Sequence, residues 1–232
     1  MRRKKILILD YSISRVEAPA IKSWMPTDAE ITALSIGTEK SFPLELLHGG
    51  FTHVIHSGSE YSIVNEEPFT QNAVIFIQET KNKGIPQMGI CYGHQLLSLA
   101  LVGRHAVRKS PNGFEAGWKE AAFTDLGMNI LGVRETETVW QHHFDEVTEL
   151  PAGSELIATN PHTEIQAYIN TEQRLFGTQF HPEFDLETGN AIYLQDRALI
   201  ESHHYKVEEL VKAKPSIDTG KIFFEFFLEL AN

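Results

Sequence analysis

The single cysteine of the chain lies in a sequence that can present its side chain for nucleophilic attack. Gly89 and Gly93 flank Cys91 at two positions on either side, between an apolar run and a predicted helix. Glycines there let a strand and the following helix approach closely, so that the cysteine projects from a tight turn at the strand's carboxyl end. The N-terminal end of the helix favours a thiolate, and its N–H groups, especially that of Tyr92, can stabilise an oxyanion. A lone cysteine is more often a buried thiol, so its partners must decide between the two interpretations.

A general base for Cys91 must come from eleven histidines, and His181 has the most suitable surroundings. It precedes Pro182, which favours an extended conformation, and Glu183 follows two residues later. In an extended segment, residues i and i+2 point to the same side, so the carboxylate can hydrogen-bond one ring nitrogen while the other faces the cysteine. His-Pro-Glu alone is more often a surface turn. Together with the cysteine turn it predicts a nucleophile, its base and the group that orients the base.

Two further histidines, His142 and His143, end a β-like segment. Adjacent residues in a strand face opposite ways, and no further ligands stand at a spacing suited to a metal ion. We therefore predict no metal site here and expect the segment to line a cleft.

The elements that must position these residues begin with an alternation of strands and helices. Apolar or β-branched runs predict buried parallel strands at 6–10, 31–36, 52–56 and 85–90. Helices are predicted at about 16–24, from a start at 65–68 to Gly84, and at about 94–102. This alternation indicates a parallel sheet with helices on both faces.

The second half of the chain has a different pattern. Short β-like segments separated by Gly, Pro and Asn turns predict antiparallel strands attached to the main sheet, at 118–123, 138–142, 154–159, 164–169 and 175–179. Two helices are expected to finish the chain. In the last one, apolar residues recur at helical spacing, which favours packing in the core over a partner surface: Ile222, Phe223, Phe226, Phe227 and Leu230. The whole chain, 1–232, is expected to form one domain with a helical extension at about 186–232.

Composition excludes several classes of protein. The 232 residues carry a net charge of −11, from 31 acidic and 20 basic side chains, which argues against a dedicated nucleic-acid-binding surface. The apolar run 6–9 is too short for a signal peptide, and no stretch approaches the roughly 18 apolar residues of a membrane span. One cysteine cannot form a disulfide within the chain. We expect a cytoplasmic protein without a membrane or nucleic-acid partner.

The paired motifs Gly89-Ile90-Cys91-Tyr92-Gly93-His94-Gln95 and Gln179-Phe180-His181-Pro182-Glu183 carry a family resemblance. From the first strand to about Phe184, the chain resembles the class I (triad) glutamine amidotransferases, particularly the glutaminase portion of GMP synthetase and its stand-alone homologues. The resemblance implies a flavodoxin-like three-layer α/β/α fold, with a mostly parallel central sheet and an additional small antiparallel sheet.

The resemblance also implies a role for each residue of the site. Cys91 would attack the γ-carbonyl of glutamine, His181 would act as general base and acid, and Glu183 would orient His181. The glutamyl thioester would then be hydrolysed, without a metal or organic cofactor. The remaining residues would form the oxyanion hole, through the N–H groups of Ser59 and Tyr92, and the substrate pocket, at Gly58, Gln95, His142 and His143.

Two departures from the family pattern affect this interpretation. The family's Ser-Gly-Gly-Pro is replaced by Ser57-Gly58-Ser59-Glu60, and a serine in place of glycine would distort the oxyanion hole if the backbone there needed a glycine-only conformation. The family's Ser-His-Gly-Asp is replaced by His142-His143-Phe144-Asp145, where Phe144 adds bulk beside the expected pocket.

Three functions remain compatible with the sequence. The first is an ammonia-producing subunit that docks on a synthetase, because no Gly-rich pyrophosphate loop follows Phe184 and the ammonia acceptor would be a partner protein. The second is an independent hydrolase of γ-glutamyl peptides or amides. The third is a silent relative retained for binding or regulation, which the intact set of Cys91, His181 and Glu183 disfavours. The sequence leaves a homo-oligomer open.

Overall fold

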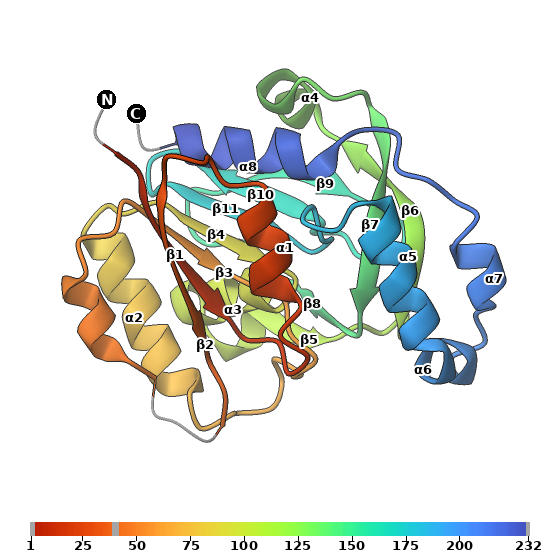
Figure 1. The fold of residues 1–232 in the computed structure, drawn as a ribbon, viewed down its shortest axis with the longest axis horizontal. Coiled ribbons are helices and arrows are strands. Elements are labelled where there is room, and N and C mark those ends of the chain that lie inside the picture. Colours follow the sequence, from red (N-terminus) through yellow and green to blue (C-terminus); the bar gives the residue numbers. More distant parts are fainter. Residues whose placement is uncertain (1–2, 39–41, 231–232) are drawn as a thin grey trace.

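The structure, a computed structural model, describes residues 3–38 and 42–230, and its centre is a nine-stranded sheet (Figure 1). In order across the sheet, the strands are β2 (Glu30–Ser35), β1 (Lys5–Asp10), β3 (His53–His56), β4 (Gln87–Ile90), β11 (Leu175–Thr178), β10 (Ala167–Asn170), β9 (Glu155–Thr159), β6 (Glu115–Phe123) and β7 (Thr136–His143). A separate antiparallel pair is formed by β5 (Val107–Lys109) and β8 (Asp145–Val147).

The sheet has a parallel and an antiparallel part. β2, β1, β3, β4 and β11 run parallel to one another, and β10, β9, β6 and β7 continue the sheet in antiparallel pairs. The strands β1, β3, β4 and β11 are almost wholly buried, as a parallel sheet covered on both faces requires. The predicted fold class is confirmed, including the antiparallel strands attached to the main sheet and the small second sheet.

Helices cover both faces of the parallel part. α1 (Glu17–Ser23) and α8 (Thr219–Glu229) lie on one face, and α2 (Thr70–Asn82) and α3 (Tyr92–Leu101) lie on the other (Figure 1). Phe223 and Phe227 of α8 are fully buried against the sheet. The last helix therefore packs in the core, as its apolar spacing predicts.

The helices after Phe184 differ from the expectation. The sequence predicts two, but the described residues up to 230 form four: α5 (Leu186–Gln195), α6 (Arg197–Ser202), α7 (Val207–Leu210) and α8. α5 and α6 meet at Asp196, and the turn at His203–Lys206 separates α6 from α7. Short helices carry too few turns to produce an apolar period. α5, α6 and α7 form a group at the end of the sheet made by β6 and β7 (Figure 1).

Several boundaries also differ. α2 begins at Thr70 rather than at 65–68, and α3 begins at Tyr92, two residues before the predicted start. α4 (Asp125–Leu131) is not predicted, although the Thr124 side chain caps it by accepting the N–H of Gly127. Within the described ranges, no helix is long and apolar enough to cross a membrane.

Candidate active site

Adjacent parallel strands bring the two sequence motifs together. Cys91 directly follows β4, His181 comes three residues after β11, and the two strands are paired in register. The N–H of Cys91 donates to the carbonyl oxygen of Thr178 at 2.8 Å, which ties the two strand ends together. β3 lies on the other side of β4 and leads into Ser57–Ser59. The carboxyl ends of three neighbouring strands therefore converge on one site.

The backbone of Cys91 has the conformation of a strained turn. Its φ of 48° and ψ of −102° lie in a region that residues with a β-carbon rarely adopt. The flanking glycines are required by close packing: a β-carbon on Gly93 would lie 2.1 Å from the carbonyl oxygen of His56, and one on Gly89 would lie 2.5 Å from the backbone of Gly93. The close approach of strand and helix predicted for these glycines is present.

The His-Pro-Glu segment is held from three sides through its backbone. The N–H of His181 donates to the carbonyl oxygen of Trp140 at 3.1 Å. Trp24 Nε1 donates to the carbonyl oxygen of Glu183 at 2.9 Å, and the Thr219 hydroxyl donates to that of Pro182 at 3.1 Å. Anchors from β7, the end of α1 and the start of α8 therefore fix the position from which the His181 ring projects.

The predicted contact between His181 and Glu183 is present. His181 Nδ1 is 2.6 Å from Glu183 Oε1, and both side chains are buried. The imidazole stacks on Phe184 and meets Trp140 edge-on. This burial lowers the pKa of His181 to about 4 and raises the pKa of Glu183 to about 7. His181 is therefore neutral at neutral pH and can accept a proton.

A second carboxyl group, which the sequence does not predict, adjoins this pair. Glu17, the first residue of α1, is buried, and its Oε1 is 3.5 Å from His181 Nδ1. Burial raises the pKa of Glu17 well above its ordinary value, and the charge of Glu183 adds to the rise. An acid in the first turn is ordinary for a helix, so the local sequence gives no sign that it reaches His181.

The Cys91 thiol differs electrostatically from the expectation. Its position at a helix terminus predicts a thiolate. Burial, followed by the neighbouring carboxyl groups of Glu17 and Glu183, instead raises the pKa of Cys91 well above its ordinary value, although the backbone N–H of Tyr92 acts in the opposite direction. Cys91 therefore rests as a thiol, and any reaction of its sulfur as a thiolate would need a base such as the neutral His181.

The N–H groups of the two predicted oxyanion donors meet no backbone acceptor within the described residues. Tyr92 is the first residue of α3, where the N–H has no acceptor within the helix, and no described residue accepts the N–H of Ser59. The distortion considered for Ser59 is absent, since the non-glycine residues with positive φ in the described ranges are Arg15, Cys91, Arg174 and His204. The Ser59 hydroxyl donates to the carbonyl oxygen of Tyr11 at 2.9 Å and so anchors the loop.

A cavity of about 500 Å³ opens at Cys91 and His181. Gln95, His142 and His143 line it, whereas Gly58 lies behind it: a β-carbon there would be 2.6 Å from His181 Cε1 and 2.7 Å from Glu17 Oε1. The remainder of the wall comes from the loop before α1 with Glu17, the loop after β3, the strand ends and the helices α5 and α6, including Glu60, Phe144, Asp145, Phe184, Ile192 and Leu199.

The side chains of the cavity wall are held in different ways. Gln95 Nε2 donates to the carbonyl oxygen of Asp145 at 2.8 Å, and His142 stacks on Trp140 with its Nε2 3.3 Å from Asp196 Oδ2. Phe144, which replaces the family's glycine, is about one-third exposed (36%) and stacks on Phe114. Its bulk therefore lies at the cavity wall, as predicted.

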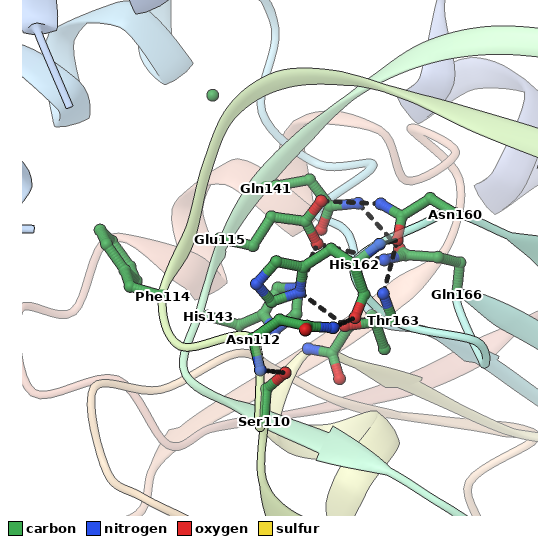
Figure 2. Close-up of polar contacts among 12 residues, drawn as sticks. Ser110, Asn112, Phe114, Glu115, Gln141, His143, Asn160, His162, Thr163 and Gln166 are labelled. Atoms are coloured by element: carbon green, nitrogen blue, oxygen red, sulfur yellow. Dashed lines mark hydrogen bonds and ion pairs between the residues drawn. The ribbon is translucent and has the colours of Figure 1, made fainter. Parts of the chain in front are cut away.

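His143 belongs to a buried polar network around Glu115 (Figure 2). His143 Nε2 is 2.9 Å from Glu115 Oε2, and His143 Nδ1 donates to the carbonyl oxygen of Asp145 at 3.0 Å. Asn160 donates to Glu115 Oε1 at 2.7 Å and Gln166 to Oε2 at 3.3 Å. Because donors already occupy both carboxylate oxygens, the cluster has the chemistry of a structural hydrogen-bond network rather than of a metal site.

Comparisons with known proteins agree with this geometry. Residues 12–200 match the family described as "Glutamine amidotransferase class-I". A glutamine-hydrolyzing GMP synthase subunit from Saccharolobus solfataricus is 37% identical over 133 residues, which are 57% of this chain and 68% of that protein. Its counterpart from Sulfurisphaera tokodaii is 33% identical over 153 residues, 66% of this chain and 77% of that protein. A solved glutamine amidotransferase structure from Thermotoga maritima shares the fold over the full length of both chains, with a TM-score of 0.80 and 21% identity.

Proposed function

The chain belongs to the class-I glutamine amidotransferase family, and from this premise we propose that Cys91, His181 and Glu183 form a catalytic triad that releases ammonia from glutamine. The observation that carries the proposal is the convergence of β4 and β11. Their joined ends direct Cys91 and His181 into one cavity, with Glu183 hydrogen-bonded to the histidine.

The proposed reaction proceeds through a thioester. His181 takes the proton from the Cys91 thiol as the sulfur attacks the γ-carbonyl carbon, and the imidazolium is stabilised by Glu183. The N–H groups of Tyr92 and Ser59 hold the negative oxygen of the tetrahedral intermediate. The carbon–nitrogen bond then breaks, and His181 returns the proton to the departing ammonia. Water, deprotonated by His181, hydrolyses the thioester, so that glutamine and water become glutamate and ammonia.

The ammonia acceptor is proposed to be a synthetase partner. Support comes from the relatives named as GMP synthase subunits, which align with 57% and 66% of this chain. An enzyme of this kind is expected to hydrolyse glutamine slowly alone and faster with its partner, because the partner completes the active arrangement.

The cavity favours a second candidate, hydrolysis of larger γ-glutamyl amides. Its volume of about 500 Å³ is in the range of pockets that enclose drug-sized ligands. Phe144, Ile192 and Leu199 give part of its wall an apolar surface. An amine larger than ammonia could occupy this space as the leaving group.

A substrate screen tests both candidates. Ammonia or amine release is measured from glutamine and from a series of γ-glutamyl amides, with Cys91→Ser as control, and a diazo-ketone analogue of glutamine is used to label the protein. We expect label on Cys91 by peptide mass spectrometry and a loss of turnover of at least about 10³-fold in Cys91→Ser. Folded wild-type protein that stays unlabelled at Cys91 would contradict the triad. Preference for glutamine or for larger amides decides between the two substrates.

A further inference from the structure

The carboxyl group of Glu17 is buried directly beside the proposed catalytic pair. Its Oε1 is 3.5 Å from His181 Nδ1, the same nitrogen that lies 2.6 Å from Glu183 Oε1. One oxygen of each carboxyl group and a ring nitrogen of His181 all lie within 4.8 Å of one another. Among the described residues, Oε2 of each carboxyl meets no N–H or hydroxyl donor, although Glu17 is only 4% exposed and Glu183 only 2%. Each of these oxygens needs a partner.

A proton shared between the two groups meets this need. A carboxylate has no proton to donate, so a hydrogen bond between two carboxyl groups requires one of them to be protonated. Glu183 accepts the Nδ1–H of His181 in a short bond and is therefore the carboxylate of the pair. Glu17 is left to carry the proton.

The surroundings of Glu17 favour its neutral form. The titratable groups that face it are Glu183 and His181 from the His-Pro-Glu turn, Asp10 from the end of β1, and Cys91 after β4. Glu60, from the loop after β3, lines the cavity at Cys91 and His181 together with Glu17. Three of these five groups are carboxyls and the other two are uncharged in the resting site, so an ionised Glu17 would add a buried negative charge to a negative environment.

The loop before α1 leaves the Glu17 carboxyl available for this role. Asp10 accepts the N–H groups of Ser12, at 2.9 Å, and Ala18, at 3.2 Å. Glu60 accepts those of Ile13 and Ser14. Other acids therefore satisfy the loop backbone, and Glu17 makes no such bond within the described residues.

We infer, resting on the proposed triad, that Glu17 is a positioning residue: in its protonated form it donates to Glu183 and holds that carboxylate against His181 Nδ1. The shared proton keeps the charge of the carboxyl pair at −1. When His181 takes the proton from Cys91, the imidazolium meets a fixed carboxylate that cannot rotate away.

Two substitutions separate this role from its alternatives. Glu17→Gln supplies an N–H donor in place of the O–H, whereas Glu17→Ala removes the donor. We expect kcat within about threefold of wild type for Glu17→Gln and a loss of about 10- to 100-fold for Glu17→Ala, with KM little changed in both. Glu79→Gln, on the exposed face of α2, is the matched control. A higher KM at unchanged kcat in both variants would instead identify Glu17 as a substrate-binding group and overturn the inference.

The pH profile of kcat/KM gives a readout that a merely structural residue would not move. Glu183 must be ionised to accept the Nδ1–H, and burial raises its pKa to about 7, so wild-type activity falls as the pH decreases through that value. A donor on Glu17 lowers the pKa of Glu183. We therefore expect the acid limb to move to higher pH in Glu17→Ala and to stay in place in Glu17→Gln. If Glu17 were ionised, both variants would remove a like charge, and both acid limbs would move to lower pH.

Infrared spectroscopy tests the protonation state without turnover. We expect the wild type at neutral pH to show a protonated-carboxyl carbonyl band that is missing in Glu17→Gln and retained in Glu79→Gln. Absence of this difference overturns the inference whether or not the protein hydrolyses glutamine. Failure of Cys91 labelling, by contrast, would overturn the proposed triad while the band is still observed. Thermal unfolding of each variant shows whether it folds. If Glu17→Ala does not fold, the comparison of the carbonyl band still uses Glu17→Gln.

Discussion

Gly58, in the loop after β3, lies against the side chains of His181 and Glu17. A methyl group at this position would meet His181 Cε1 and Glu17 Oε1 at less than 3 Å. Both side chains are buried, so neither can move without losing its contacts. We expect Gly58→Ala to lower kcat about 100-fold, because a displacement of about 1 Å in a reacting group has an effect of this size.

Measurement of kcat together with the thermal unfolding midpoint separates displacement from unfolding in Gly58→Ala. A folded variant with wild-type kcat would show that His181 tolerates the displacement, and the proposed geometry would then be wrong.

The residues of the site differ in how well the sequence reveals them. Cys91 and His181 lie in motifs whose local backbone rules, glycine-flanked turn and X-Pro extension, fix the direction of a side chain. Glu17 follows no such rule, because its role depends on a contact with His181, far along the chain. Helix patterns describe only which face a residue occupies, so the sequence could not identify the second carboxyl group.

At the scale of elements, Glu115 joins the antiparallel strands beneath the cavity wall. It pairs in register with His143 across β6 and β7 and accepts hydrogen bonds from the β9–β10 connection (Figure 2). Glu115→Gln would place amide hydrogens against existing donors and leave His143 without its carboxylate. We expect a loss of about 3 kcal/mol in the free energy of unfolding at neutral pH, measured by urea denaturation. Glu120→Gln, on the exposed part of the same strand, should stay within about 0.5 kcal/mol of wild type.

The stability lost in Glu115→Gln should depend on pH in a direction that the pKa of Glu115 determines. Burial raises the pKa of Glu115, but the hydrogen bond and charge of His143, with His162 and Asn160, outweigh it, and the net pKa lies below the ordinary 4.5. A carboxyl group with a lowered folded pKa stabilises fully above its unfolded pKa and loses that contribution as the pH falls through the folded value. The difference in stability between wild type and Glu115→Gln should therefore shrink in acid. A difference that stays constant from neutral pH into the acid range below the ordinary carboxyl pKa would show that the ion pair is not its source.

The strands and helices differ in how well the spacing of apolar residues predicts them. The parallel strands at the centre of the sheet follow from apolar runs, because burial on both faces leaves few polar positions in them. α5, α6 and α7 are too short and too exposed on one side to show a clear apolar period, so the sequence predicts one helix where the structure has three. The predicted start of α3 is late because Cys91 itself takes the N-cap position with a positive φ, which only the tertiary structure imposes.

At the scale of the whole molecule, the cavity is formed by segments that lie far apart in the sequence. Its wall combines the loop before α1, the loop after β3, the start of α3, the end of β7 and the α5–α6 pair. The parallel part of the sheet supplies the proposed reacting groups, and the antiparallel part with its helices supplies the apolar wall. The groups proposed for chemistry and for substrate choice therefore lie on separate parts of the fold and can be altered separately.

Leu199 of α6 provides the test of this separation. Both Leu199 and Leu194 of α5 are exposed, by 38% and 51%, but only Leu199 is among the residues that line the cavity. If the apolar wall holds the leaving amine, Leu199→Ser should lower kcat/KM for a γ-glutamyl amide of an apolar amine about 10-fold, because a lost apolar contact of this size weakens the transition state by that factor. Glutamine, whose leaving group is ammonia, should be hydrolysed at an unchanged rate, and Leu194→Ser should alter neither substrate. An equal loss for both substrates would place Leu199 in the support of the catalytic groups instead, and the wall would then have no part in selecting the amine.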